Sequence, residues 1–212
     1  MEVMVFAGGD ALHASWRPLL PIGAILIAAD SGLEHIEALG LKADYVVGDM
    51  DSVSPPTLER AMAAGTQVER HPAAKDATDL ELALSTAQRL GAESVTIVGA
   101  GGGRLDHFLA NALLLASPEW AGLRLQALVG PACVVVVRPE AELRGRAGSV
   151  VTLLALHGIA SGVSTTGLRW MLSNDDLHPG STRGVSNEMT ESRARVTVRE
   201  GVVLAIQPTG GS

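Results

Sequence analysis

The feature that most constrains this chain is a change in its pattern of predicted secondary structure slightly past its middle. Before it, short apolar runs such as residues 3–7, 24–29 and 94–98 alternate with stretches of helical period. In the clearest such stretch, residues 80–90, apolar residues recur at i, i+3, i+4, i+7 and i+10. Strands that alternate with helices at short intervals predict an α/β layer with a mostly parallel sheet.

After the change only β-rich runs follow, separated by Gly, Pro, Ser and Asn. Glu200-Gly201 lies between two of these apolar segments and is interpreted as a hairpin turn. The sequence therefore predicts an N-terminal α/β domain over residues 1–129 and a small all-β sandwich domain over residues 130–212. The β-rich runs are residues 123–128, 132–137, 149–156, 163–172 and 194–206.

Charge and composition exclude several classes of protein. The 16 basic and 23 acidic residues give a net charge of −7, and Lys42 and Lys75 are the only lysines. A nucleic-acid-binding face or a polybasic membrane patch is therefore not expected. No apolar run is long enough for a membrane span, the first residues lack the pattern of a signal peptide, and the single cysteine, Cys133, lies in an apolar run. These features predict a soluble cytoplasmic protein that binds neither nucleic acid nor membrane.

Two acidic residues, Asp49 and Asp51, follow the short apolar run 45–47 directly. In an extended chain, alternate side chains share a face, so both carboxylates could reach one cation. Oxygen ligands without nearby Cys or His favour Mg²⁺. The alternative interpretation is a solvated turn.

A second acidic pair, Asp76 and Asp79, stands beside Lys75 at the start of the most regular helical stretch. Lysine and helix-start amides suit a phosphate, and carboxylates suit its Mg²⁺. In the alternative interpretation, Asp76 is an N-cap and Asp79 complements the helix dipole.

A glycine run, residues 101–103, separates a predicted strand from a predicted helix and is followed by Arg104. Such a turn lets backbone amides approach an anion, and an arginine can bind phosphate with two hydrogen bonds. His107 could equally be structural. The sequence has no P-loop, no dinucleotide-binding Gly-x-Gly-x-x-Gly and no Gly-x-Ser-x-Gly elbow.

Together these motifs resemble the bacterial form of thiamine pyrophosphokinase over nearly the whole chain. Gly167-Leu168-Arg169-Trp170-Met171-Leu172 and Ser186-Asn187-Glu188 resemble pieces of the family's thiamine domain. The pieces that resemble the family's catalytic motifs are Asp30-Ser31-Gly32, Gly48-Asp49-Met50-Asp51-Ser52, Asp76-Ala77-Thr78-Asp79 and Gly102-Gly103-Arg104-Leu105-Asp106-His107 followed by Asn111.

The resemblance implies an α/β catalytic domain that binds ATP and Mg²⁺, a β-sandwich that helps to bind thiamine, and a homodimer with sites at the subunit interface. Ser31 stands where the family more commonly has glycine, so the loop would be reshaped if that residue required a positive φ. The implied metal ligands are Asp49, Asp51 and Asp76; the implied nucleotide or catalytic contacts are Asp30, Ser31, Gly32, Lys75, Thr78, Asp79, Gly102, Gly103, Arg104 and Asp106; the implied thiamine contacts are Trp170, Ser186 and Asn187.

Trp170 also has a physical reason to contact thiamine, because an indole face attracts cations and stacks on flat rings. The alternative is that Trp170 belongs to the sandwich core, since Leu168 and Leu172 flank it with strand alternation. The expected reaction is attack of the thiamine hydroxyl on the β-phosphorus of ATP, with either Asp79 or Asp106 as proton acceptor. Rival functions are pyrophosphoryl transfer to another hydroxymethyl heterocycle, such as a pterin, and a non-catalytic nucleotide or thiamine diphosphate sensor.

Overall fold

The computed structural model describes residues 1–21, 23–74, 76–102 and 104–209. The chain divides into two compact units. The first unit contains Met1–Asn111 and Ala127–Gly130, and the second contains Ala112–Gln126 and Pro131–Ser212. The boundary predicted between residues 129 and 130 stays a prediction.

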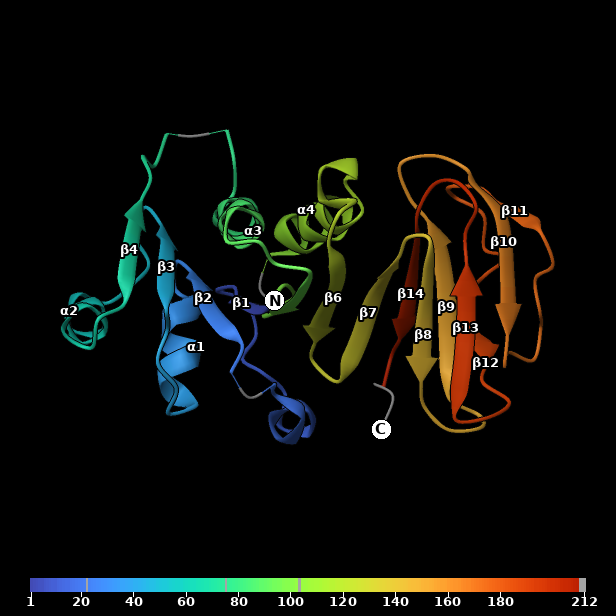
Figure 1. Cartoon of the computed structure of the whole chain (residues 1–212), viewed down its shortest axis with the longest axis horizontal. Coiled ribbons are helices and arrows are strands. Elements are labelled where there is room, and N and C mark those ends of the chain that lie inside the picture. Colours follow the sequence, from blue (N-terminus) through green and yellow to red (C-terminus); the bar gives the residue numbers. More distant parts are fainter. Residues whose placement is uncertain (22, 75, 103, 210–212) are drawn as a thin grey trace. The chain divides into compact units, whose positions relative to one another are not determined.

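The first unit contains a parallel sheet with the strand order β5-β1-β2-β3-β4, of which β1 to β4 are labelled in Figure 1. The register places Val5 of the internal strand β1 opposite Ile27 on one side and Ile97 on the other. These three side chains are fully buried, as expected for a strand covered on both faces. The strands are β1 (Glu2–Phe6), β2 (Ile25–Ala29), β3 (Tyr45–Gly48), β4 (Gln67–Arg70) and β5 (Ser94–Val98).

Helices alternate with these strands, which confirms the predicted α/β class. Ser54 directly before Pro55 is a sequence pattern typical of a helix start, and α2 does begin there: the Ser54 hydroxyl accepts a hydrogen bond from the Thr57 amide. The apolar residues Leu80, Ala83 and Leu84 form the buried face of α3, which packs on β1, β2 and β3. The helices are η1 (Ala14–Leu19), α1 (Gly32–Ala38), α2 (Pro55–Ala63), α3 (Asp79–Arg89) and α4 (Leu105–Leu115), the last of which ends in the second unit.

The second unit is a sandwich of antiparallel strands. One set pairs in the order β7-β14-β9-β12, and the other in the order β11-β10-β13-β8. A cluster of buried apolar side chains, including Val151, Leu143 and Val196, draws on both sets. The elements are η2 (Pro118–Trp120), β7 (Ala132–Val137), β8 (Glu140–Arg144), β9 (Val150–Ala155), β10 (Ala160–Thr166), β11 (Asp175–Leu177), β12 (Asn187–Glu188), β13 (Arg193–Thr197) and β14 (Val203–Gln207), together with the first half of β6 (Arg124–Val129), whose last residues belong to the first unit.

Two details of the second unit differ from the sequence prediction. Glu200-Gly201 is not a hairpin turn, because β13 pairs with β8 and β10 whereas β14 pairs with β7 and β9. The segment instead carries the chain from one sheet of the sandwich to the other. The β-rich run over residues 163–172 is a strand only as far as Thr166, because Gly167 has a φ of +71°. Trp170 therefore lies in a loop.

Candidate active site

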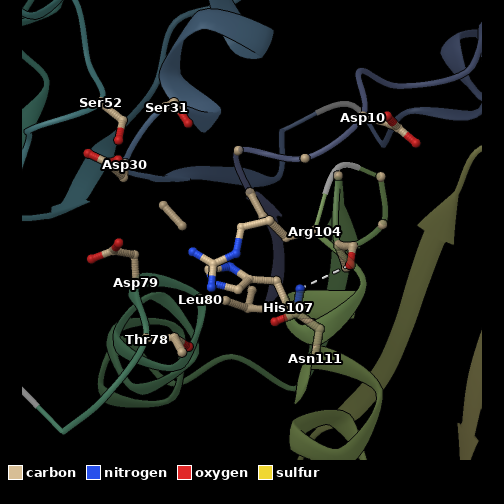
Figure 2. A pocket seen from close by; sticks show the side chains of 18 residues that line it. Asp10, Asp30, Ser31, Ser52, Thr78, Asp79, Leu80, Arg104, His107 and Asn111 are labelled. Carbon is tan, nitrogen blue, oxygen red and sulfur yellow. Dashed lines mark hydrogen bonds between the residues drawn. The ribbon is translucent and has the colours of Figure 1, made fainter. Parts of the chain in front are cut away.

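A pocket of about 610 Å³ opens in the first unit, where the strands end and the helices begin (Figure 2). It is lined by the loops that follow β1, β2, β3 and β5, and by the first turns of α3 and α4. In open α/β sheets, ligands bind outside the carboxyl ends of the strands. In the view of Figure 2, Asp30 and Asp79 lie toward one side of the pocket and Asp10 toward the other.

Two glycine-rich loops at the pocket are joined by backbone hydrogen bonds. The amide of Gly9 donates to the carbonyl of Gly99 at 3.1 Å, and the amide of Asp10 donates to that of Gly101 at 2.9 Å. A Cβ atom on Gly9 would lie 2.1 Å from the carbonyl oxygens of both Gly99 and Gly101, so no other residue fits there. The ring of His35, on α1, lies 2.9 Å from the carbonyl oxygen of Gly9 through its Nε2 atom and anchors the first loop.

The glycine run after β5 is only partly described. Gly102 has a φ of +85°, and a Cβ atom there would lie 2.1 Å from a carboxylate oxygen of Asp10. Gly103, which the sequence also assigns to the nucleotide site, lies outside the described residues. The positive φ favours glycine at position 102, and a side chain there would also displace the carboxylate of Asp10.

Arg104 follows this run, lines the pocket and pairs with Asp106. Its Nη2 atom lies 2.6 Å from Oδ2 of Asp106, and both side chains are exposed. The arginine lowers the pKa of Asp106 to about 2. Among the described residues that line the pocket, Asp106 is absent, whereas His107 and Asn111 of the same helix are present. The side-chain amide of Asn111 donates to the carbonyl of Ala100 at 3.0 Å, which ties α4 to the loop after β5.

Three carboxylates, those of Asp30, Asp49 and Asp51, lie within 4.8 Å of one another. Asp30 is 7% exposed, and its Oδ1 atom has no hydrogen-bond partner among the described residues. Burial raises the pKa of Asp30, and the charges of Asp79 and Asp49 add to the effect, although hydrogen bonds from Ser52 and Ser31 oppose it. A buried carboxylate that has an oxygen without a hydrogen-bond partner and lies close to two other carboxylates is chemically suited to a divalent cation.

The backbone of this carboxylate group is unusual at two positions. Asp30 has a φ of +48° and Met50 a φ of +67°. The expectation that Asp49 and Asp51 alternate along an extended chain was therefore wrong, because Met50 turns the chain between them. The amide of Asp51 donates to Oδ1 of Asp49 at 3.2 Å across this turn. Ser31 has a φ of −59°, so the serine found in place of the commoner glycine fits without reshaping.

The first turn of α3 shows that Asp76 does not cap the helix, which was one of the two interpretations of this residue. Thr78 is the N-cap, since its hydroxyl accepts a hydrogen bond from the Glu81 amide at 3.3 Å, so Asp76 is not the cap. Asp79 lines the pocket, and a Cβ atom on Gly48 would lie 2.9 Å from its carboxylate. Lys75 lies outside the described residues. Asp76 is exposed, and the carboxylate group found among the described residues does not include it, so its role as a metal ligand stays a prediction.

In the second unit, Trp170 is 55% exposed, whereas Leu168 and Leu172 on either side of it are buried. The alternative that Trp170 belongs to the sandwich core is therefore excluded. The guanidinium carbon of Arg169 lies 5.1 Å from the centroid of the indole. This distance falls within the range of cation–π contacts, so the indole already faces a cation.

Asn187 holds the backbone of Trp170 in this position. Its Oδ1 accepts a hydrogen bond from the Trp170 amide at 3.1 Å, and its Nδ2 donates to the Trp170 carbonyl at 2.7 Å. Asn187 is 6% exposed, so these bonds are shielded from water. Ser186 is exposed, has a φ of +58° and donates its amide to the Thr152 hydroxyl at 3.1 Å. The structure thus brings Trp170 and Asn187 into direct contact.

Two family models match this chain, one over its N-terminal part and one over its C-terminal part. The family model described as thiamin pyrophosphokinase, catalytic domain, matches residues 18–126, and that described as thiamin pyrophosphokinase, vitamin B1 binding domain, matches residues 135–203. The chain belongs to the thiamine pyrophosphokinase family.

Individual relatives of this family agree with the family models. The thiamine pyrophosphokinase of Bacillus subtilis is 27% identical over 186 residues, which cover 86% of each chain. A solved thiamin pyrophosphokinase family protein from Enterococcus faecalis has a TM-score of 0.81 and 26% identity, and covers 98% of both chains. The solved Bacillus subtilis structure has a TM-score of 0.85 over 99% of both chains at 24% identity, and supports the fold.

Seen within the thiamine pyrophosphokinase family, the pocket contains more residues than the sequence motifs predicted. The predicted Asp30, Ser31, Thr78, Asp79, Gly102 and Arg104 all line it. Ser52, the last residue of the Gly48–Ser52 motif, lines it without having been assigned a role, and Asp10 lies outside every motif; Gly8-Gly9-Asp10 at the end of the first strand was the available signal for Asp10. Among the described residues, no helix has the length and apolar character needed to cross a membrane.

Proposed function

We propose that this chain transfers the terminal diphosphate of ATP to the hydroxyl of thiamine, which yields thiamine diphosphate and AMP. The observation that carries the proposal is the match of the family's catalytic-domain model to residues 18–126. The loops of this range supply most of the pocket and the carboxylate group of Asp30, Asp49 and Asp51, of which Asp30 lines the pocket. The match of the vitamin B1 binding model to residues 135–203 supports thiamine over a pterin as acceptor.

The nucleotide phosphates are proposed to bind against the glycine loops. Backbone amides at a strand-to-helix turn attract anions, and the side chain of Arg104 provides a positive charge at the same pocket. In phosphoryl transfer, catalysis is mostly alignment and charge neutralisation. The role of the loops is to hold the phosphate chain in line with the acceptor, and the role of Arg104 is to stabilise charge on the phosphate oxygens and the leaving AMP.

Asp30, Asp49 and Asp51 are proposed to hold a divalent cation, with Mg²⁺ as the preferred ion. The group contains only carboxylates, which suits a hard cation, and the unpartnered Oδ1 of buried Asp30 supplies an acceptor for it. When bound, the cation would neutralise phosphate charge. Asp76 remains a further candidate ligand on the family resemblance.

Asp79 is a better candidate than Asp106 for the carboxylate that accepts the proton of the thiamine hydroxyl. Asp79 lines the pocket, whereas Asp106 is paired with Arg104, which lowers the pKa of that carboxyl to about 2. A proton acceptor is most effective when its pKa is near the working pH. The pairing instead gives Asp106 the role of orienting the guanidinium of Arg104.

Thiamine is proposed to stack on the exposed indole of Trp170. The ligand offers a thiazolium cation and a flat aminopyrimidine, and both are suited to an aromatic face. Asn187 is proposed to act by fixing the Trp170 backbone, since its side-chain carbonyl and amide are both bonded to that backbone. Ser186 precedes Asn187 in the same segment and remains a proposed thiamine contact.

We further propose a homodimer in which each site joins the α/β unit of one subunit to the β-sandwich of the other. Helix α4 supports the proposal because it exposes several large apolar side chains. Such a stripe carries no charge and is compatible with burial against a second copy. The exposed residues are Leu105 at 71%, Phe108 at 39%, Leu109 at 54% and Leu113 at 50%.

Mixing two inactive variants tests the shared site. Asp49→Asn damages the α/β unit and Trp170→Ala the sandwich, so each homodimer is impaired at both sites. After random re-pairing of equal amounts, about half of the dimers are mixed and one of their two sites is intact, so about a quarter of wild-type activity should return. No recovery, despite demonstrated subunit exchange, would reject the shared site.

The cytoplasm is the proposed location, consistent with a single cysteine, Cys133, that is buried and whose pKa is raised to about 11 by burial.

The activity itself is tested by incubating the protein with ATP, Mg²⁺ and thiamine and quantifying AMP and thiamine diphosphate by chromatography. A parallel incubation with a hydroxymethyl pterin tests the alternative acceptor. Binding of thiamine diphosphate without any turnover would instead identify a sensor.

A further inference from the structure

Met50 adopts a backbone conformation that its side chain disfavours. Its φ is +67°, in the left-handed region, yet it has a Cβ atom and lacks the short polar side chain that lets Asn and Asp tolerate this region. The side chain is 8% exposed, so it is buried. A strained residue of this kind persists only when the surrounding structure holds it in place.

The conformation has a direct effect on the neighbouring carboxylates. Because the chain turns at Met50, the amide of Asp51 reaches back to Oδ1 of Asp49 at 3.2 Å. An extended residue at position 50 would carry residue 51 away from that carboxylate. The same turn leaves both carboxylates within 4.8 Å of each other and of Asp30.

We propose that Met50 is a positioning residue: its buried side chain holds a left-handed backbone turn that aims Asp49 and Asp51 at a shared divalent cation. The inference rests on the cation site proposed above. Met50 itself has no carboxylate and does not touch the cation. Its contribution is that the two ligands on either side of it are already aligned before the cation arrives.

The substitutions Met50→Leu and Met50→Ile test the proposal as a matched pair. The two new side chains are isomers, so both keep apolar volume at the buried position, but only isoleucine is branched at Cβ and disfavours a positive φ. The measurement is Mn²⁺ binding to the nucleotide-free full-length protein, followed by electron paramagnetic resonance. We expect Met50→Leu to bind within about twofold of wild type and Met50→Ile to bind at least about tenfold more weakly.

The control pair is Met4→Leu and Met4→Ile. Met4 is 1% exposed and lies in strand β1, where a β-branched residue is tolerated. Both of these variants should keep wild-type Mn²⁺ affinity. Equal affinities for Met50→Leu and Met50→Ile would overturn the proposal while leaving the transferase activity standing. Failure of the wild type to bind Mn²⁺ would overturn it together with the proposed cation site.

A second pair covers the case in which Met50→Ile does not fold. At an ordinary buried position, alanine gives a more stable protein than glycine, because glycine loses more chain entropy on folding. At a left-handed residue the order reverses, so Met50→Gly should melt at or above the temperature of Met50→Ala, with both measured in EDTA. A clearly higher melting temperature for Met50→Ala would overturn the assigned turn.

Discussion

The pocket of the first unit and the Trp170 segment of the second unit hold their functional side chains by different means. In and beside the pocket, the backbone conformation places the carboxylates and glycines, through positive φ at Asp30 and Met50 and through the hydrogen-bonded glycine loops. In the loop that contains Trp170, the buried side chain of Asn187 holds the backbone of this residue by two hydrogen bonds, while its indole stays exposed. Charges that align phosphates require precise positions, whereas stacking on a flat ligand requires an accessible face.

The largest effect is expected from Asp49→Asn, which tests whether the fixed carboxylates carry the chemistry. The change is nearly isosteric but removes a charge at the proposed cation site. Turnover should fall at least about a hundredfold, roughly 2.7 kcal/mol of transition-state stabilisation. The melting temperature should not fall, because the charge of Asp49 contributes to the raised pKa of buried Asp30.

Asp76→Asn is the informative comparison for this prediction. Asp76 was predicted as a ligand from the resemblance, but it is exposed and does not belong to the carboxylate group of the described residues. A smaller loss than that of Asp49→Asn is expected. Equal losses would restore the ligand set predicted from sequence, and turnover of Asp49→Asn within about tenfold of wild type would reject Asp49 as an essential ligand.

Gly9→Ala tests the rigid glycine loops and should have the second largest effect. The new Cβ atom would lie 2.1 Å from two backbone oxygens, those of Gly99 and Gly101, so one loop must move. We expect kcat/KM for ATP to fall at least about tenfold, or 1.4 kcal/mol, with a smaller change for thiamine. Gly122→Ala is the matched control, since a Cβ atom there meets nothing within 4 Å. A lower melting temperature with unchanged ATP kinetics would show that the loops are only structural.

The sequence predicts the class of this fold well because periodicity reports burial directly. The helical spacing of Leu80, Ala83, Leu84 and Ala87 is the buried face of α3, and Ser54 caps α2 as its position before two prolines predicts. Strand partners are harder to predict, because pairing depends on distant segments. The turn at Glu200-Gly201 has the composition of a hairpin, yet the strands on its two sides join different sheets.

In the candidate site, too, local features could be predicted from the sequence and contacts between distant segments could not. Short motifs predicted residues that do line the pocket, such as Asp30 and Arg104. They did not predict that Asp30 joins Asp49 and Asp51, because that proximity arises where neighbouring strands end. Nor could the strained φ of Met50 be inferred from a residue type that rarely adopts it.

Trp170→Ala tests the clamped segment and should affect binding more than stability. The thiamine KM should rise several-fold to about tenfold, with little change for ATP, and Trp170→Phe should recover part of the loss. The melting temperature should change by less than about 4 °C, since an exposed side chain contributes about 1 kcal/mol or less.

Trp120→Ala is the matched control for this change. Trp120 is 1% exposed, and truncation of a buried tryptophan costs about 3–5 kcal/mol of stability. It should therefore melt at a much lower temperature than Trp170→Ala. A sharp drop in melting temperature for Trp170→Ala with an unchanged thiamine KM would contradict the stacking role.

The smallest effect is expected from Asp106→Asn, which asks whether every charge near the pocket takes part in proton transfer. The bond from Arg104 holds the pKa of Asp106 at about 2, below its ordinary value of 3.8. A folded-state pKa that is lowered stabilises the protein above pH 3.8, and this stabilisation is lost as the pH falls through about 2. The contribution at neutral pH is small, because both partners are exposed and screened by water.

Asp106 is therefore ionised throughout the working range and is a weak proton acceptor. In Asp106→Asn, the KM for ATP should rise a few-fold as Arg104 loses its partner, and the limbs of the pH–rate profile should stay in place. The measurement is kcat and kcat/KM between pH 5 and 9 for the variant and the wild type. A displaced acidic limb in the kcat profile of the variant would assign proton transfer to Asp106 and would remove the reason for preferring Asp79.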